Sequence, residues 1–284
     1  MQYGLYMPNL SVAADPRLLI ELAQEAEVAG WDGFFLWDHI SLGLYEMAVV
    51  DPWIVMAGIA SHTKHIRFGP LVTPLPRRRP WMVAREALAL DHLSNGRFIL
   101  GVGVGNEPFS LDNFGEETDI KRRAAMTDEA LDILVGLWSG KPFNYTGSYY
   151  QVKDTVFLPA PVHPGGIPIW VAATWPHKAP MRRAARWDGV VPSAGNVDKH
   201  INVATYREFV TYIREQQATA KPFDFLYYGT TTGDDPGRDA DTILPLADAG
   251  MTWWLEDMRC GADLEQWNSI DASRNRIRKG PPRL

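Results

Sequence analysis

The chain has 284 residues, of which 46% are hydrophobic and 22% are charged, and its formal net charge is −6. This composition is typical of a globular protein. It excludes a disordered chain and gives no sign of the clustered basic surface of nucleic-acid-binding proteins. The single cysteine, Cys260, excludes an intrachain disulfide and any metal site built from several cysteines. No apolar run reaches the roughly 18 residues of a membrane span, and residues 1–10 lack the pattern of a secretory signal. We therefore expect a soluble, cytoplasmic protein with no membrane or nucleic-acid partner.

Short β-rich runs alternate with stretches of helical periodicity along the first half of the chain. Asp15-Pro16 and Asp51-Pro52 each combine a helix N-cap with a proline at the first helical position, and Pro80 opens a third helix. The four strands predicted here span residues 2–7, 33–37, 66–72 and 97–104.

The second half of the chain repeats this alternation after an insertion. Residues 119–138 predict a long helix, and the segment after it predicts a β-hairpin at 145–152 around Thr146-Gly147. Residues 279–284 predict a frayed tail. Four more strands, each followed by a helix, are predicted at 167–173, 189–192, 223–230 and 252–256.

Eight strands that are each followed by a helix predict a (β/α)8 TIM barrel, with an insertion between strands four and five. We expect residues 1–284 to form a single domain of this kind. An open doubly wound sheet is the alternative, although such a sheet rarely repeats eight units so regularly. The two tryptophans at 253 and 254 should alternate, one pointing into the barrel and one toward the helices.

Function in such barrels lies on the loops at the C-terminal ends of the strands. Asp38 and His39 follow strand two and are either a helix cap beside a histidine whose hydrogen bonds are satisfied or, as we expect, a contact to a ligand or substrate. His62 and His65 have metal-ligand spacing but lie at the opposite end, so we predict no metal site. The other candidates at strand ends are Asn9, Thr73, Asn106, Glu107, Thr174, Trp175, Ser193, Thr231, Glu256 and Asp257.

Two short motifs have alternative interpretations. The glycines at 101, 103 and 105 lack the helix start that completes a dinucleotide-binding motif. They indicate either backbone packed against a flat ligand or a tight strand end. The run Arg77–Arg79 beside the barrel end is either an anion contact or a solvated surface.

Four segments of this sequence resemble the luciferase-like flavin-dependent oxidoreductases, in the same order along the chain. They are WDGFFLWDH at 31–39, the run from RFGPLVTP to GVGVG at 67–105, and residues 147–173 and 229–257. The resemblance implies a TIM barrel that is usually dimeric, so we expect a homodimer. It also implies that FMN or the deazaflavin coenzyme F-420 binds at the C-terminal end of the barrel, together with a small-molecule substrate.

The resemblance also implies roles for individual residues. Asp38 and His39 match the acidic–histidine pair that works beside the reactive ring of the coenzyme. Pro70, Leu71 and Thr73 match a bulge in strand three with a non-prolyl cis peptide, which the resemblance places at Pro70–Leu71. The remaining cofactor-binding positions that it implies are Gly105 and Asn106 after strand four, and Ala172, Ala173, Thr174 and Trp175 at the phosphate end.

The sequence departs from this family's deazaflavin alcohol and sugar dehydrogenases at two positions. Those enzymes carry a tryptophan five residues beyond the aspartate after strand two, and a glutamate after the strand-four glycines. Here the two positions hold Gly43 and Asn106, and Glu107 is only adjacent. The sequence therefore does not choose between FMN and the deazaflavin, or between monooxygenation and hydride transfer.

The prediction is a flavin-type oxidoreductase in which His39 acts as a general acid/base or hydrogen-bond donor. One alternative is a non-catalytic flavin-binding protein of the same fold. The other is a cofactor-free hydrolase or lyase, which needs paired carboxylates at the barrel end from among Glu107, Glu256 and Asp257.

Overall fold

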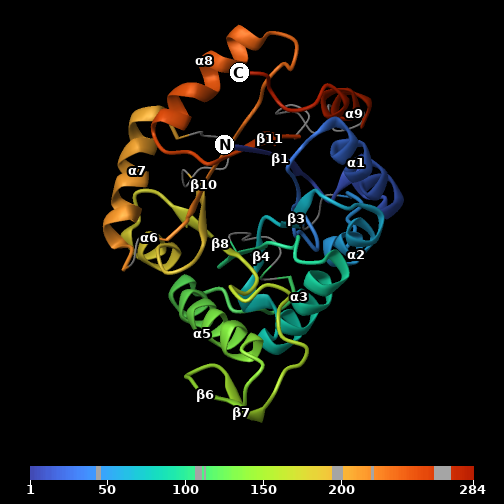
Figure 1. Ribbon diagram of the computed structural model, residues 1–284. Coiled ribbons are helices and arrows are strands. Elements are labelled where there is room, and N and C mark those ends of the chain that lie inside the picture. The colour runs from blue at the N-terminus through green and yellow to red at the C-terminus, as the bar shows by residue number, and fades with distance from the viewer. Residues whose placement is uncertain (43–45, 106–110, 112, 194–200, 219–220, 259–269) are drawn as a thin grey trace.

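The computed structural model describes residues 1–42, 46–105, 111, 113–193, 201–218, 221–258 and 270–284 (Figure 1). Gly43, Asn106, Glu107 and Cys260 lie outside the described residues, and the Ser193 side chain is also not described. The predictions made for these residues are therefore not examined by the structure.

The described residues form a parallel sheet of nine strands that is wound into a TIM barrel. Its order is β3-β2-β1-β11-β10-β9-β8-β5-β4, and a parallel bridge between Phe68 and Phe98 joins β3 to the chain leading into β5. β3 lies within the strand predicted at 66–72, whereas β4 follows it at residues 73–74, and the two together fill one of the eight barrel positions. The strands are β1 Gln2–Met7, β2 Gly33–Leu36, β3 Arg67–Pro70, β4 Thr73–Pro74, β5 Leu100–Gly103, β8 Ile169–Thr174, β9 Gly189–Ser193, β10 Asp224–Gly229 and β11 Trp253–Asp257.

Helices lie around the outside of the barrel (Figure 1). The predicted N-caps are confirmed: Asp15 accepts from the Arg17 amide at 2.8 Å, and Asp51 accepts from the Trp53 amide at 2.8 Å. Such bonds satisfy amides that the first helical turn leaves without a partner. The described helices are α1 Pro16–Ala29, α2 Pro52–His62, α3 Pro80–Ser94, α5 Ile120–Trp138, α6 Lys178–Ala184, α7 Val203–Gln216, α8 Pro236–Asp248 and α9 Ile270–Arg278.

The predicted insertion is an antiparallel hairpin of β6 (Phe143–Thr146) and β7 (Gln151–Thr155). It projects from the barrel beyond α5 (Figure 1). The Glu129 carboxylate of α5 accepts hydrogen bonds from the backbone amides of residues 148, 149 and 150 at 2.7–3.0 Å. The helix therefore holds the hairpin turn in place.

Two apolar cores lie on opposite faces of the barrel wall. The outer core fills the space between the strands and the helices, and it contains Trp254. The inner core includes Trp253, whose ring centroid is 5.3 Å from that of Trp170. The predicted alternation of Trp253 and Trp254 is confirmed. The inner core is composed of Phe35, Leu71, Ile99, Trp170, Leu226, Trp253 and Leu255.

The prediction of a frayed tail was wrong for residues 280–282, which pack against the barrel, whereas Arg283 and Leu284 are exposed. The Gly280 carbonyl accepts from Arg276 Nη1 at 2.7 Å, and both Gly280 and Pro282 are buried. The tail therefore packs against the end of α1, where a Cβ added at Gly280 would lie 2.8 Å from the Ala29 carbonyl oxygen. None of the described helices is long and apolar enough to cross a membrane.

Candidate active site

Side chains at the C-terminal end of the barrel divide into two contrasting halves. Strand alternation puts them in the layer just above the inner core. What we call the aromatic half comes from β1, β11 and β10 and from the residue after β2. What we call the small-residue half comes from β5, β8 and β9 and from the residue before β4. The aromatic half consists of Trp37, Tyr6, Asp257 and Tyr228, and the small-residue half consists of Val72, Gly103, Ala172 and Val191.

Rings run without interruption along the aromatic half. The centroid of Tyr6 lies 5.5 Å from that of Trp37 and 5.7 Å from that of Tyr228. The row continues to His39, whose ring centroid is 5.2 Å from that of Trp37. These four side chains are only partly buried. The predicted acid/base residue therefore stands at one end of a row of aromatic rings.

The glycines of β5 let residues 70–72 pack closely against the β5 backbone. A Cβ at Gly101 would lie 2.1 Å from the Pro70 carbonyl oxygen, and one at Gly103 would lie 2.8 Å from Val72 Cγ2. Of the two interpretations, the tight strand end is the one that fits Gly101 and Gly103, because Pro70 and Val72 take the space that a ligand would need. The surface left toward the barrel end is formed by Val72 and Ala172, both half-buried.

The non-prolyl cis peptide predicted in strand three lies one residue later than expected, at Leu71–Val72 and not at Pro70–Leu71. The Leu71 amide still donates to the Leu36 carbonyl at 2.7 Å, so the ladder with β2 continues through Leu71. The chain departs from the regular strand only after that hydrogen bond. Pro70 and Leu71 thus belong to the wall, with Leu71 in the inner core.

Asp38, which follows β2, is buried and connects the end of β2 with β4 and α2. Its Oδ2 atom accepts from Thr73 Oγ1 at 2.5 Å and from Trp53 Nε1 of α2 at 3.0 Å. Burial raises the pKa of the Asp38 carboxyl group, although these two hydrogen bonds act in the opposite direction. Asp38 was predicted beside His39 as a catalytic pair, but its described contacts are with Thr73 and Trp53. It therefore positions strand three next to Val72. Sequence reasoning missed Trp53, which sits two residues after the N-cap Asp51 as an ordinary apolar helix residue.

Asn9 holds the backbone of His39. Its Nδ2 atom donates to the carbonyls of His39 at 2.9 Å and Val50 at 2.7 Å, and Oδ1 accepts from the His39 amide at 3.4 Å. Asn9 is fully buried. Its side chain therefore fixes where the loop after β2 leaves the barrel, and with it the base of the His39 side chain.

The three arginines beside the barrel end differ in their contacts. Arg77 pairs with Glu116 at 2.8 Å, and Arg78 pairs with Glu86 at 2.5 Å while its guanidinium lies 4.5 Å from the Trp53 ring centroid. Arg79 is exposed. Two of the three charges are thus balanced by carboxylates, which weakens the anion-contact interpretation of this run.

The predicted phosphate end follows β8. Thr174 is half-buried, and its carbonyl accepts from the His177 amide at 3.0 Å just before α6 begins. The Ala173 methyl group points into the outer core, so only its backbone could meet a ligand here. Lys178 Nζ lies 4.3 Å from the Trp175 ring centroid, which places a cation beside this loop.

The carboxylates at the end of β11 point in opposite directions. Glu256 is buried on the outer side, where it accepts from the Thr231 amide at 2.6 Å and from Arg276 at 3.2 Å. Asp257 belongs to the inner side. These two residues therefore do not form the paired carboxylates that a cofactor-free hydrolase needs.

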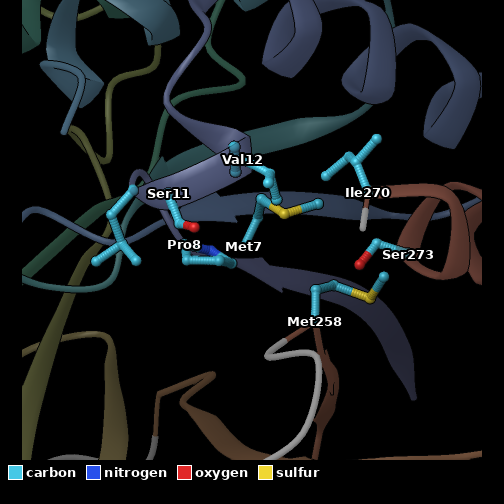
Figure 2. Close-up of a pocket in the computed structure, with 9 residues that line it drawn as sticks. Met7, Pro8, Ser11, Val12, Met258, Ile270 and Ser273 are labelled. Carbon is cyan, nitrogen blue, oxygen red and sulfur yellow. The ribbon is translucent and has the colours of Figure 1, made fainter. Parts of the chain in front are cut away.

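A separate apolar pocket lies on the outer side of β1, between residues 7–13 and the start of α9 (Figure 2). Met7 lines it, whereas its neighbour Tyr6 faces the barrel end. The pocket is therefore separated from the predicted coenzyme position by the barrel wall. Its lining residues are Met7, Pro8, Leu10, Ser11, Val12, Ala13, Met258, Ile270 and Ser273.

Comparison with known proteins agrees with this architecture. A family model described as luciferase-like monooxygenase matches residues 1–274. The chain is 33% identical over 184 residues to an F420-dependent glucose-6-phosphate dehydrogenase of Amycolatopsis mediterranei. That match covers 63% of this chain and 54% of the relative, so it spans about half of the relative's length.

Solved structures share the fold over nearly the whole chain. The F420-dependent tetrahydromethanopterin reductase from Methanopyrus kandleri superposes with a TM-score of 0.74 at 18% identity, covering 96% of this chain and 97% of that one. The oxygenating constituent of 3,6-diketocamphane monooxygenase from Pseudomonas putida, in complex with FMN, gives a TM-score of 0.66 at 21% identity. That second match covers 99% of this chain and 89% of the other.

Proposed function

Because the chain belongs to the luciferase-like monooxygenase family, we propose that it is a flavin-type oxidoreductase that acts on a small organic substrate with FMN or coenzyme F-420. The observation that carries this is the small-residue half of the barrel end, where Val72 and Ala172 form a low apolar surface beside Thr73 and Asp38. A flat ring system fits against such a surface, because the described side chains that form it are small. Relatives that use F420 and one that is bound to FMN support either coenzyme.

When bound, the coenzyme supplies hydride transfer or, as a reduced flavin with oxygen, oxygenation. The protein's part is to bind and orient. Thr73 donates to Asp38, which also accepts from Trp53, and it would support Val72 on the surface proposed for the coenzyme ring. His39 donates or accepts a proton at its imidazole ring, and Asn9 holds the backbone from which that ring extends.

The phosphate end of the coenzyme belongs to the loop after β8 in this proposal. The Thr174 hydroxyl and the backbone amides of Ala173 and Trp175 can donate to phosphate oxygens. The Lys178 ammonium group, held beside the Trp175 ring, adds a positive charge. Gly105, with its φ of +75°, belongs to the same proposal, as does Asn106, which lies outside the described residues.

Equilibrium titration of the purified protein with FMN, with F-420 and with NAD tests the proposal. We expect saturable binding of FMN or F-420, seen as a change in the coenzyme's absorbance or fluorescence, and much weaker binding of NAD. Tight binding of NAD with none of the other two contradicts the proposal. Binding without turnover of any substrate would identify the non-catalytic alternative instead.

A homodimer and a cytoplasmic location belong to the same proposal. The first comes from the family resemblance and the second from composition. Light scattering coupled to size-exclusion chromatography would give about twice the chain mass of 31.9 kDa for a dimer.

A further inference from the structure

The aromatic half has no role in holding the coenzyme under the proposed function. Its rings come from three barrel positions, β10, β1 and the end of β2, and together they face the same end of the barrel as Val72 and Ala172. In the described layer, large rings occur on one side and small side chains occur on the other. This asymmetry requires an explanation beyond coenzyme binding.

The rings are arranged as a surface and not as a closed core. Tyr6 and Tyr228 pack against the inner core below them, yet both remain partly exposed, as does Trp37. The interplanar angles of Tyr6 with Trp37 and with Tyr228 are 45° and 35°, so the rings are tilted relative to one another and none of these pairs is edge-to-face. Exposed aromatic rings favour partners that are themselves flat and apolar.

Charge at the barrel end argues in the same direction. Of the three arginines of the strand-three segment, Arg77 and Arg78 are paired with Glu116 and Glu86, and Arg79 is exposed. The carboxylate of the aromatic half belongs to Asp257, which is buried, and the imidazole of His39 lies at the end of the row. To a phosphate or carboxylate of a substrate, the described side chains of this row therefore offer aromatic rings and the imidazole of His39, and no arginine or lysine.

We infer that the substrate is a flat, uncharged or cationic ring compound that lies against Tyr6, Trp37 and Tyr228, with its reacting edge toward His39. The inference rests on the proposed function, because it assumes that the coenzyme lies on the small-residue half. The substrate is then held between the coenzyme ring and the aromatic half. The rings determine specificity, and a sugar phosphate is excluded as the preferred substrate.

Calorimetric titration of the coenzyme-loaded protein with three probes tests this inference. 2-Naphthol represents a flat neutral ring, 1-octanol a flexible apolar chain, and glucose 6-phosphate an anionic sugar. We expect 2-naphthol to bind most tightly. Equal or tighter binding of octanol or of glucose 6-phosphate would overturn the inference.

Variants of the aromatic half give the second arm of the test. Tyr6→Leu and Tyr228→Leu should each weaken 2-naphthol binding about fivefold, while Tyr228→Phe keeps the ring and the affinity. The matched control is Tyr227, the neighbour of Tyr228 on the outer face, whose hydroxyl donates to the Ile201 carbonyl at 2.6 Å. Tyr227→Phe should leave 2-naphthol binding unchanged.

Separate titrations distinguish the two proposals. Each variant is first titrated with the coenzyme alone, and its affinity should equal that of the parent. If the coenzyme binds but 2-naphthol binding does not depend on Tyr6 or Tyr228, the substrate inference fails by itself. If the parent binds no coenzyme, the proposed function fails. The coenzyme-free protein then still tests the aromatic half, because loss of 2-naphthol affinity in the leucine variants would support it and unchanged affinity would overturn it.

Discussion

The two ends of the barrel use charged side chains in different ways. At the N-terminal end, the Arg97 guanidinium donates to the carbonyls of residues 60, 63, 66 and 94 and to the Thr63 hydroxyl, at 2.8–3.0 Å. The Glu27 carboxylate at the same end accepts from the amides of residues 64, 65 and 66. Here the charged side chains supply hydrogen-bond partners to backbone carbonyls and amides, and they hold the loops that precede the strands.

At the C-terminal end, the buried carboxylate of Asp38 accepts hydrogen bonds from side chains, whereas the Glu27 carboxylate accepts them from backbone amides. Asp38 accepts from Thr73 and Trp53, and both bonds orient a surface that remains partly open. The difference teaches that substitutions at the first end should change stability, whereas substitutions at the second should change ligand binding and turnover. The predictions below test this separation.

The largest effect is expected for Arg97→Ala. Loss of the guanidinium leaves several carbonyls without donors, so the free energy of unfolding should fall by about 3 kcal/mol. Coenzyme affinity of the folded protein should not change. Urea denaturation measures the first quantity and coenzyme titration the second. Arg85→Ala, which removes an exposed side chain with one bond to the Leu158 carbonyl, is the control and should cost less than about 1 kcal/mol. A weaker coenzyme affinity in Arg97→Ala would break the separation of the two ends.

Thr73→Val should affect the other end. This substitution keeps the shape of the side chain but removes one of the two donors to the buried Asp38 carboxylate. The loss of that donor should lower the free energy of unfolding by about 2 kcal/mol. We expect coenzyme affinity to fall, because the support of Val72 is loosened. Thr127→Val removes a hydroxyl that bonds the Arg123 carbonyl inside α5, so it serves as the buried control. Equal coenzyme affinities in the two variants would argue against the role given to Asp38.

His39→Ala should lower turnover at least tenfold without unfolding the protein. A tenfold loss corresponds to about 1.4 kcal/mol of transition-state stabilisation, which is modest for one acid/base group. His62→Ala is the matched control at the opposite end, where His62 Nδ1 is 2.8 Å from the Gly58 carbonyl oxygen of its own helix. Steady-state kinetics and circular dichroism measure the outcome. Unchanged kinetics in a folded His39 variant would contradict its acid/base role and indicate a structural one.

The smallest effect concerns acid stability and Glu27. Burial raises the pKa of this carboxyl group, but hydrogen bonds from the amides of residues 64–66 outweigh it and hold the pKa below its ordinary value of 4.5. Because the folded-state pKa is lowered, the stabilisation is complete above about pH 4.5 and is lost as the pH falls through the folded-state value. In Glu27→Gln, the free energy of unfolding, measured by urea denaturation, should fall less steeply as the pH is lowered below about 4.5. A profile as steep as that of the parent would contradict this.

Local signals in the sequence were enough to predict the repeating architecture. Helix starts at Asp15-Pro16 and Asp51-Pro52, the turn between β6 and β7, and the alternation of Trp253 and Trp254 each depend on a few neighbouring residues. Eight such units close into a barrel because parallel strands need helical crossovers. The same local signals failed for the tail, since its burial depends on α1, far away in the sequence.

What the sequence by itself determined is therefore the barrel, its insertion and the end at which its candidate residues gather. Only the tertiary structure decided how those residues act. It brought Asp38 into contact with Trp53 and Thr73, and it directed Glu256 outward to Arg276. It also placed the strand-three segment in the space beside the glycines of β5. It also divided the barrel end into an aromatic and a small-residue half. The physical reason is that periodicity assigns a residue to one face of a strand, whereas its partner on that face comes from another strand or helix whose distance depends on the closure of the whole barrel.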